Sequence, residues 1–247
     1  MDTAASPVII ASPLDGNGRR TLRLNRPTKA NAVDLTLADA LLHWVELSAR
    51  DGCRALVIEA EGRNFCAGFD FDGFADTATG VLLQRFVALE QAFQLLRSAP
   101  FVSIALVDGA AFGAGADLAL ACTYRIGTAR ARFRFPGYGF GVALGTRHLA
   151  HAIGAQAARD ILLRNRVVGS DEALALGLLT HATDEAAMGG IVDGLLGEIR
   201  PLSSGAIRRI HALTAPHNDE GDMAELVRSL SEPGLHERIA AYRKAHA

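Results

Sequence analysis

Residues 101–122 read FVSIALVDGAAFGAGADLALAC. The apolar, β-branched run over 101–107 predicts a buried strand, which an Asp-Gly pair ends. The glycine-rich turn at 113–115 then opens a helix of small residues. Because a further strand is predicted over 124–127, the segment is typical of a βα unit in a parallel α/β sheet.

The chain before this segment has the same alternation of elements. The pattern predicts a short strand over 20–25, a helix with an aspartate at its start over 34–49, a compact strand over 55–59, and a helix over 82–98 that an Ala-Pro pair ends. The first part of the chain is therefore expected to alternate strands and helices.

The rest of the chain is predicted to be almost entirely helical. Apolar spacing indicates helices over 148–153, 155–163, 170–176, 185–199 and 205–213, and over a tail, 222–247, broken by a Pro-Gly pair. We expect an α/β core, residues 1–190, that carries the functional site. Residues 191–247 are expected to form a helical region that oligomerises and covers the pocket.

Composition restricts the class of partner. Apolar residues make up 49% of the 247 residues and charged residues 21%, which is enough for a large buried core. The formal net charge is −2 and like charges do not cluster. This argues against a nucleic-acid or membrane surface and favours a small-molecule partner.

The cysteines and the termini indicate the compartment. Cys53, Cys66 and Cys122 lack metal-ligand spacing and cannot all pair with one another, which favours a reducing, cytoplasmic environment. No basic patch leads into an apolar stretch near the N-terminus, and no apolar run is long enough to span a bilayer. We expect neither export nor membrane insertion.

Several motifs occur in a recognisable order. They are LNRP at 24–27, KANA at 29–32, GRNFCAGFD at 62–70, VDG at 107–109 and AFGAGADL at 111–118, followed by Val168, Glu172-Ala173 and Gly177-Leu178. In order and spacing they resemble the enoyl-CoA hydratase/isomerase (crotonase) family over about residues 24–179. The resemblance implies an α/β, crotonase-like spiral of repeated ββα units with a C-terminal helical extension.

The resemblance also implies an oxyanion hole, made in the family by two backbone N–H groups. Here these belong to Phe69, in the Ala-Gly-x-Asp loop, and Ala114, in the glycine-rich turn. The physical reason holds for any such turn, since glycines let the amides approach a ligand and the helix directs its positive end there. Two donors aimed at a developing thioester enolate stabilise the transition state by about 3 kcal/mol each.

The family binds coenzyme A near the same segments, largely through backbone groups. On this basis the predicted substrate-binding residues are Lys29, Ala30, Ala67, Gly68, Asp70 and Gly113. The alternative for Lys29 is an ordinary solvated lysine. The predicted partner is an acyl-CoA thioester, with coenzyme A as part of the substrate and no separate cofactor.

The carboxylates determine which reaction the hole serves. Hydratases of the family use two glutamates, one to activate water and one to protonate the α-carbon. The first corresponds to Asp117, one methylene shorter, and the second to Gly137, which carries no acid. Asp117 is the main acid/base candidate, and its alternative role is to interact with the helix dipole alone.

Three nearby side chains are auxiliary candidates for the missing glutamate. Tyr138 adjoins Gly137, and Asp70 and Asp72 follow the oxyanion loop. A tyrosine more commonly packs with a bonded hydroxyl, and an aspartate at position 70 more commonly supports the loop. These roles therefore rank below that of Asp117.

Two other kinds of site are disfavoured. His148 and His151 are close in sequence, but no third ligand has metal spacing, so no metal is predicted. The turn at 113–115 resembles part of a dinucleotide fingerprint, but Leu118 stands where a third glycine is needed.

Three functions remain open. The first is an enoyl-CoA hydratase or isomerase of fatty acid metabolism. The second is a specialised family member, such as a decarboxylase, carbon–carbon bond hydrolase or lyase, which the changes at Asp117 and Gly137 favour. The third is a protein that binds CoA thioesters without turnover. The family usually forms trimers or dimers of trimers, and the helices near 223–230 and 236–242 are amphipathic enough to pack on the protein's own body or on a neighbouring subunit.

Overall fold

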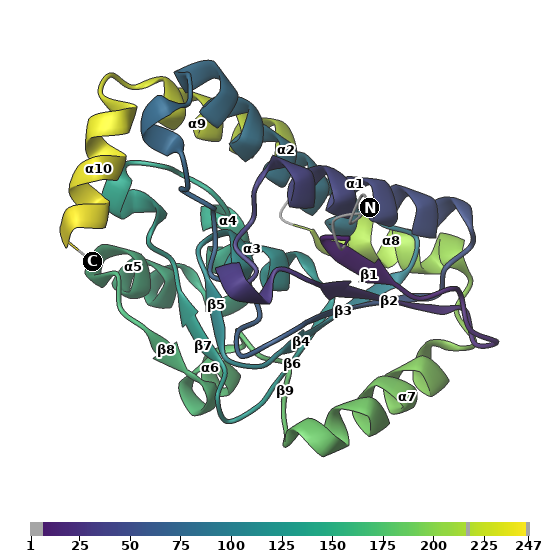
Figure 1. Ribbon diagram of the computed structural model, residues 1–247. Helices are drawn as coiled ribbons and strands as arrows, with labels where there is room; N and C mark the ends of the chain where they lie inside the picture. The colour runs from purple at the N-terminus through teal and green to yellow at the C-terminus, as the bar shows by residue number, and fades with distance from the viewer. Residues whose placement is uncertain (1–6, 216–217, 246–247) are drawn as a thin grey trace.

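The computed structural model describes residues 7–215 and 218–245 and contains two sheets (Figure 1). The larger sheet has six strands in the order β1-β2-β3-β4-β6-β9, and all neighbours except β1 and β2 are parallel. Its strands are β1 (Ile9–Ala11), β2 (Arg19–Leu24), β3 (Ala55–Ala60), β4 (Val102–Val107), β6 (Tyr124–Gly127) and β9 (His181–Ala182).

The smaller sheet follows directly from the larger one. Its order is β5-β7-β8, formed by β5 (Ala110–Phe112), β7 (Arg132–Arg134) and β8 (Val168–Gly169). In the larger sheet β4 pairs in parallel with β6. The strands that follow them in the chain, β5 and β7, also pair in parallel, in the smaller sheet. This repetition of paired strands is the predicted spiral of repeated units.

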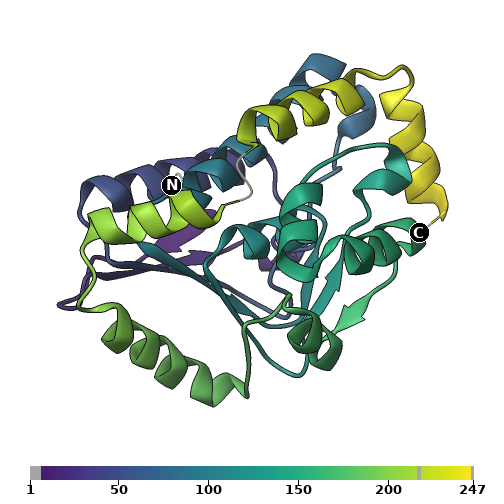
Figure 2. The same cartoon turned by 180° about the vertical axis from the view of Figure 1, so that it is seen from behind.

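Alternating residues of the central strands bury both faces of the larger sheet. Leu56 and Ile58 pack in one cluster with α1 (Leu35–Arg50) and α2 (Thr79–Arg97). Val57 and Ile104 pack on the other face with α7 (Met188–Ile199) and α8 (Ser204–Thr214). Figures 1 and 2 show α7 across the sheet from α1 and α2. Such continuous apolar strands are typical of parallel sheets covered on both sides.

The remaining helices surround the smaller sheet and the C-terminus. They are α3 (Ala114–Ala121), α4 (Thr146–Ile153), α5 (Ala155–Arg164), α6 (Ser170–Leu176), α9 (Asp219–Ser231) and α10 (Leu235–Ala245), with 3₁₀ turns η1 (Pro27–Lys29), η2 (Phe74–Asp76), η3 (Gly137–Phe140) and η4 (Glu185–Ala187). Helix α9 packs on α2, and α10 on η2 and η3.

Most predicted elements are present with small shifts at their ends, and Asp34 caps α1 by accepting a hydrogen bond from Leu37 N at 2.9 Å. The short strands β1, β5, β7, β8 and β9 were not predicted, and two of them interrupt the region expected to be almost all helix. The predicted domain boundary, residue 190, lies inside α7, which packs on the core sheet. The division at that residue stays a prediction.

Gly115 allows α3 to lie against the loop that carries Cys66. A Cβ atom at position 115 would overlap Cys66 O, a backbone atom that cannot rotate away. We expect Gly115→Ala to destabilise the fold by about 1–3 kcal/mol, as overpacking does. Urea unfolding measures this change.

Gly190→Ala provides the matched control for that substitution. Gly190 lies in α7, where an added Cβ would have nothing within 4 Å, so alanine there is expected to stabilise the helix by about 0.5–1 kcal/mol. Equal effects of the two substitutions would show that the contact with Cys66 does not restrict position 115.

Candidate active site

Two loops from distant parts of the sequence meet at the start of α3. Cys66 forms a parallel bridge with Ala111, and Phe112 N–H donates to Cys66 O at 2.9 Å. These bonds place Gly68 beside the glycine-rich turn, since a Cβ at Gly68 would lie 3.6 Å from Ala114 N. The pairing therefore brings the two predicted hole-forming segments together.

The two predicted donors are free to bind a ligand. Within residues 7–215 and 218–245, neither Phe69 N–H nor Ala114 N–H has a backbone or side-chain acceptor. Gly113 N–H, by contrast, donates to Arg134 O at 2.8 Å. Gly113 has φ 49° and ψ −123°, which glycine adopts readily, and this turn aims the first N–H of α3 outward from the helix.

Asp117 lies one turn into α3 and is buried, with 7% of its surface exposed. Its Oδ1 has no hydrogen-bond partner in the part of the chain that the structure describes. Burial raises the pKa of the Asp117 carboxyl well above the usual aspartate value, and the nearby Glu90 carboxylate raises it further, while Arg97 acts in the opposite direction. Carboxyl groups with pKa values perturbed in this way cluster at functional sites.

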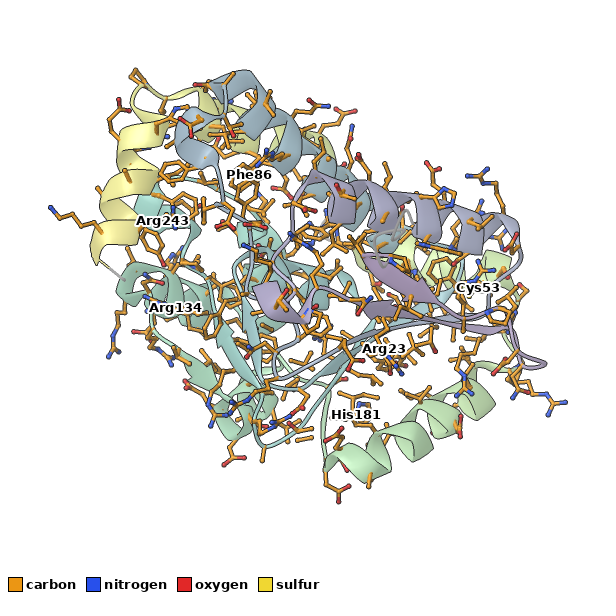
Figure 3. The ribbon with its side chains drawn as sticks, in the orientation of Figure 1. Arg23, Cys53, Phe86, Arg134, His181 and Arg243 are labelled. Carbon is orange, nitrogen blue, oxygen red and sulfur yellow. The ribbon has the colours of Figure 1, made fainter. Side chains whose placement is uncertain are left out.

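Asp117 and residues of both loops line a cavity of about 600 Å³. Its lining combines backbone of the hole, one acid, several aromatic rings and cations of α10: Ala67, Gly68, Phe69, Phe71, Phe86, Phe112, Gly113, Ala114, Asp117, Arg134, Phe135, Pro136, Gly137, Tyr138, Phe140, Val142, Leu144, Leu162, Tyr242, Arg243 and Lys244. Figure 3 labels Phe86, Arg134 and Arg243 around this region. The cavity has the size and mixed lining of a small-molecule site.

The aromatic side chains form a connected wall of this cavity. Phe69 stacks on Phe86 with centroids 4.1 Å apart, and Phe71 meets Phe140 edge-on at 5.4 Å. Tyr242 of α10 packs on Phe140 at 5.2 Å. These rings give an apolar wall to the cavity that the two free N–H groups share.

Comparison with known proteins shows the family of this chain. A profile described as enoyl-CoA hydratase/isomerase matches residues 17–226. The chain belongs to that family. A solved structure from Bordetella parapertussis, assigned to the same hydratase/isomerase group, superposes with a TM-score of 0.93 at 34% identity and covers 96% of this chain and 99% of that one.

Two curated relatives differ in their named reactions. Enoyl-CoA hydratase AFT6-1 of Alternaria alternata is 28% identical over 231 residues, which is 88% of this chain and 76% of the relative. 4-Chlorobenzoyl coenzyme A dehalogenase-2 of an Arthrobacter species is 27% identical over 246 residues, which is 92% of this chain and 88% of the relative. Membership of the hydratase/isomerase family therefore establishes acyl-CoA processing and leaves the reaction open.

The position of the family's second glutamate is crowded. Gly137 lines the cavity, but a Cβ there would lie 2.7 Å from Val142 O. Tyr138 also lines the cavity, and its hydroxyl lies 2.9 Å from Thr146 Oγ1. The tyrosine hydroxyl therefore has a local partner, although 48% of the residue is exposed, and its role stays a prediction.

The predicted CoA-binding residues fall into two groups. Ala67, Gly68 and Gly113 line the cavity, whereas Lys29, Ala30 and Asp70 are absent from its lining in the described chain. Roles for all six in binding coenzyme A stay predictions.

The three residues that do not line the cavity form ion pairs and hydrogen bonds within the protein. Lys29 pairs with Asp72, and Ala30 O accepts a hydrogen bond from Ala67 N at 2.9 Å. Asp70 accepts from Arg26 at 2.9 Å and from the Asp72 N–H at 3.0 Å, the loop-supporting role that ranked first for it.

Asn31 is a supporting residue that the sequence did not single out. Its side chain is fully buried and donates to Glu61 O and Asn64 O, both at 2.9 Å. Its own Oδ1 accepts from Arg26 N at 2.8 Å. Asn31 thus joins the segment after β2 to the loop that leads to the oxyanion hole.

The structure adds two acids to the neighbourhood of His148. Ligand atoms of His148, Asp219 and Asp222 lie within 4.8 Å of one another, a grouping that sequence spacing did not predict. Each carboxylate already has an arginine partner, Arg97 at 3.3 Å from Asp219 and Arg147 at 3.0 Å from Asp222. These pairs compete with a cation, and the absence of a metal site stays a prediction.

The three cysteines are unpaired and buried. Burial raises the pKa of the Cys53 thiol to about 11 and that of Cys66 and Cys122 to about 12. Thiols with such pKa values are poor nucleophiles at neutral pH.

Proposed function

We propose that the protein stabilises the enolate of an acyl-CoA thioester, with Phe69 N–H and Ala114 N–H as the oxyanion hole and Asp117 as the acid/base group. One observation carries the proposal: two N–H groups without acceptors and one buried acid without a partner for Oδ1 face the same cavity. Such preorganised donors act most strongly where water is excluded.

In the proposed mechanism the thioester oxygen accepts hydrogen bonds from both N–H groups. When a bond at the α-carbon breaks, its electron pair moves into the new carbon–carbon double bond and negative charge collects on that oxygen. Asp117 gives or takes the proton at the substrate carbon. The aromatic wall gives the hole an apolar surrounding.

Hydratase or isomerase chemistry is the first candidate for the overall reaction. A specialised decarboxylase, carbon–carbon bond hydrolase or lyase is the second, and a specific observation favours it: position 137 lacks a carboxylate and has no room for a Cβ. A reaction that needs one acid would be compatible with this site. Binding without turnover is the third candidate.

The acyl group is proposed to be bulky and apolar. Rings of Phe69, Phe71, Phe86 and Phe140 line the cavity, and aromatic walls favour flat or branched apolar groups. Phe74 packs on Phe71 at 6.4 Å between ring centroids and does not line the cavity. The Arthrobacter relative is named for a chlorobenzoyl thioester.

The deciding experiment combines binding with two assays on one preparation. Acetyl-CoA is titrated by calorimetry, crotonyl-CoA hydration is followed by absorbance, and exchange of the α-hydrogens of butyryl-CoA with deuterium is followed by mass spectrometry. We expect binding and exchange. Hydration as well would identify a hydratase, whereas binding without either reaction would support a binding protein. Failure to bind would overturn the proposal.

A trimer-based assembly is also proposed. Exposed apolar side chains lie on α5 and close to it in the chain, at Leu163, Val167 and Leu174. Burial of such side chains is a common reason for association. A monomeric mass by light scattering would exclude the assembly.

No described helix is both long and apolar enough to cross a membrane.

A further inference from the structure

Arg134 is a cation of the cavity lining that the proposed mechanism does not use. It is the last residue of β7, and its register partner in the parallel strand β5 is Phe112. Register partners in adjacent strands direct their side chains to the same face of a sheet, and both of these residues line the cavity. Phe133, the residue before Arg134, is fully buried in the core. The pleat of β7 therefore directs Arg134, and not Phe133, to the cavity.

The guanidinium of Arg134 is fixed at one edge and free at the other. Its Nε donates to Asn165 O and to Asn165 Oδ1, both at 3.1 Å. Asn165 is itself fixed at the end of α5, where its N–H donates to Leu162 O. Within the described chain the terminal nitrogens of Arg134 donate to no acceptor, and no carboxylate forms an ion pair with this residue. The terminal nitrogens are therefore available to a ligand.

The charged residues of the cavity lining are mostly cations. Among the described residues, Asp117 is the one acid of the lining, whereas Arg134, Arg243 and Lys244 are basic. The Arg243 guanidinium lies over the ring of Phe74, 5.3 Å from its centroid. Figure 3 labels Arg134 and Arg243 on the same side of the molecule. A lining with this excess of positive charge favours a ligand that carries negative charge.

The position of Arg134 favours an anionic group on the acyl part of the ligand over the phosphates of coenzyme A. Arg134 O accepts a hydrogen bond from Gly113 N–H at 2.8 Å, and Gly113 directly precedes the proposed oxyanion donor Ala114. The backbone of Arg134 is thus bonded to the turn that is proposed to hold the thioester oxygen. In an acyl-CoA the long pantetheine arm separates the thioester from the nearest phosphate, whereas a carboxylate on a short acyl group lies close to the thioester.

We propose that Arg134 determines substrate specificity by binding a carboxylate of the acyl group, so that the preferred substrate is the CoA thioester of a dicarboxylic acid. The inference rests on the proposed function and adds one charged end to the apolar acyl group proposed there. The terminal nitrogens of a guanidinium can donate two parallel hydrogen bonds to one carboxylate. Because Asn165 already holds Nε, less side-chain entropy is lost when the carboxylate binds.

The test compares matched pairs of thioesters by calorimetry. Malonyl-, succinyl- and glutaryl-CoA are paired with propionyl-, butyryl- and pentanoyl-CoA, in which a methyl group replaces the terminal carboxylate. For at least one chain length we expect the wild-type protein to bind the dicarboxylic member more tightly. Arg134→Met should reduce the ratio of the two affinities by about 10- to 100-fold, the value of a hydrogen-bonded charge pair.

Arg132→Met is the matched control. Arg132 lies on the same strand, but it is exposed and does not line the cavity. The substitution removes the same charge and should leave the ratio of affinities at the wild-type value. Thermal unfolding establishes that the variants are folded. If Arg134→Met does not fold, Arg134→Gln takes its place, because glutamine removes the charge and keeps an N–H donor on the side chain.

A wild-type protein that prefers the dicarboxylic member at no chain length would overturn the inference. Loss of affinity in Arg134→Met that is equal for both members of every pair would also overturn it and would assign Arg134 to the phosphates of coenzyme A. Equal changes of the ratio in Arg134→Met and Arg132→Met would show an effect of net charge alone. Binding of the methyl-terminated thioesters to the wild type tests the proposed function separately, and failure to bind any thioester would overturn both proposals.

Discussion

Replacing Asp117 with asparagine is expected to slow deuterium exchange at the α-carbon of a bound acyl-CoA by about 10²- to 10⁴-fold, the contribution of a positioned general acid or base. Asparagine keeps the size of the side chain and removes the ionisable proton. The free N–H groups of Phe69 and Ala114 are unchanged, so the affinity measured by calorimetry should change little. The rate is measured by mass spectrometry at saturating butyryl-CoA.

The same substitution gives a second readout through stability. Burial raises the native pKa of Asp117, so the native protein holds this proton more tightly than the unfolded chain. The stability of the wild type therefore decreases as pH rises from the ordinary aspartate value, about 3.9, through the raised native value. In Asp117→Asn this decrease should be absent in urea unfolding at a series of pH values. An Asp117→Asn protein that exchanges deuterium at the wild-type rate and keeps the wild-type pH dependence of stability would exclude Asp117 as the acid/base group.

The sequence predicted the long elements because periodicity and capping operate locally. The apolar run in β3 and the cap at Asp34 are legible in a few neighbouring residues. Strands such as β8 and β9 contain two residues each and exist only because a distant strand pairs with them. No local pattern of that length distinguishes a strand from a loop.

The site divides in the same way. Phe69, Ala114, Asp117 and Gly137 are readable because their motifs are contiguous, and the structure brings all four to one cavity. Glu90 lies in an ordinary helical pattern, and its relation to Asp117 depends on how α2 packs on α3. Tertiary contacts of this kind could not be inferred from one sequence.

Replacing Ala114 with proline is expected to slow the same exchange reaction by about 10²- to 10³-fold, the effect of removing one oxyanion donor. Ala114 is the first residue of α3, where proline is well tolerated and where the N–H has no intrahelical acceptor. Proline disfavours the helical region for the preceding residue, but Gly113 is at φ 49° and ψ −123° and already lies outside it. The substitution should therefore delete a donor and leave the helix intact.

Ala114→Gly separates the loss of the donor from the loss of the methyl group, because glycine retains the N–H. Its exchange rate is expected to stay near that of the wild type, while thermal unfolding establishes that both variants are folded. The proline ring also occupies part of the space next to the thioester oxygen, so acyl-CoA affinity is measured for each variant and the rates are compared at saturation. A folded Ala114→Pro protein with the wild-type exchange rate would contradict the proposed oxyanion hole. Charge on the thioester oxygen would then be stabilised by groups other than the Ala114 N–H.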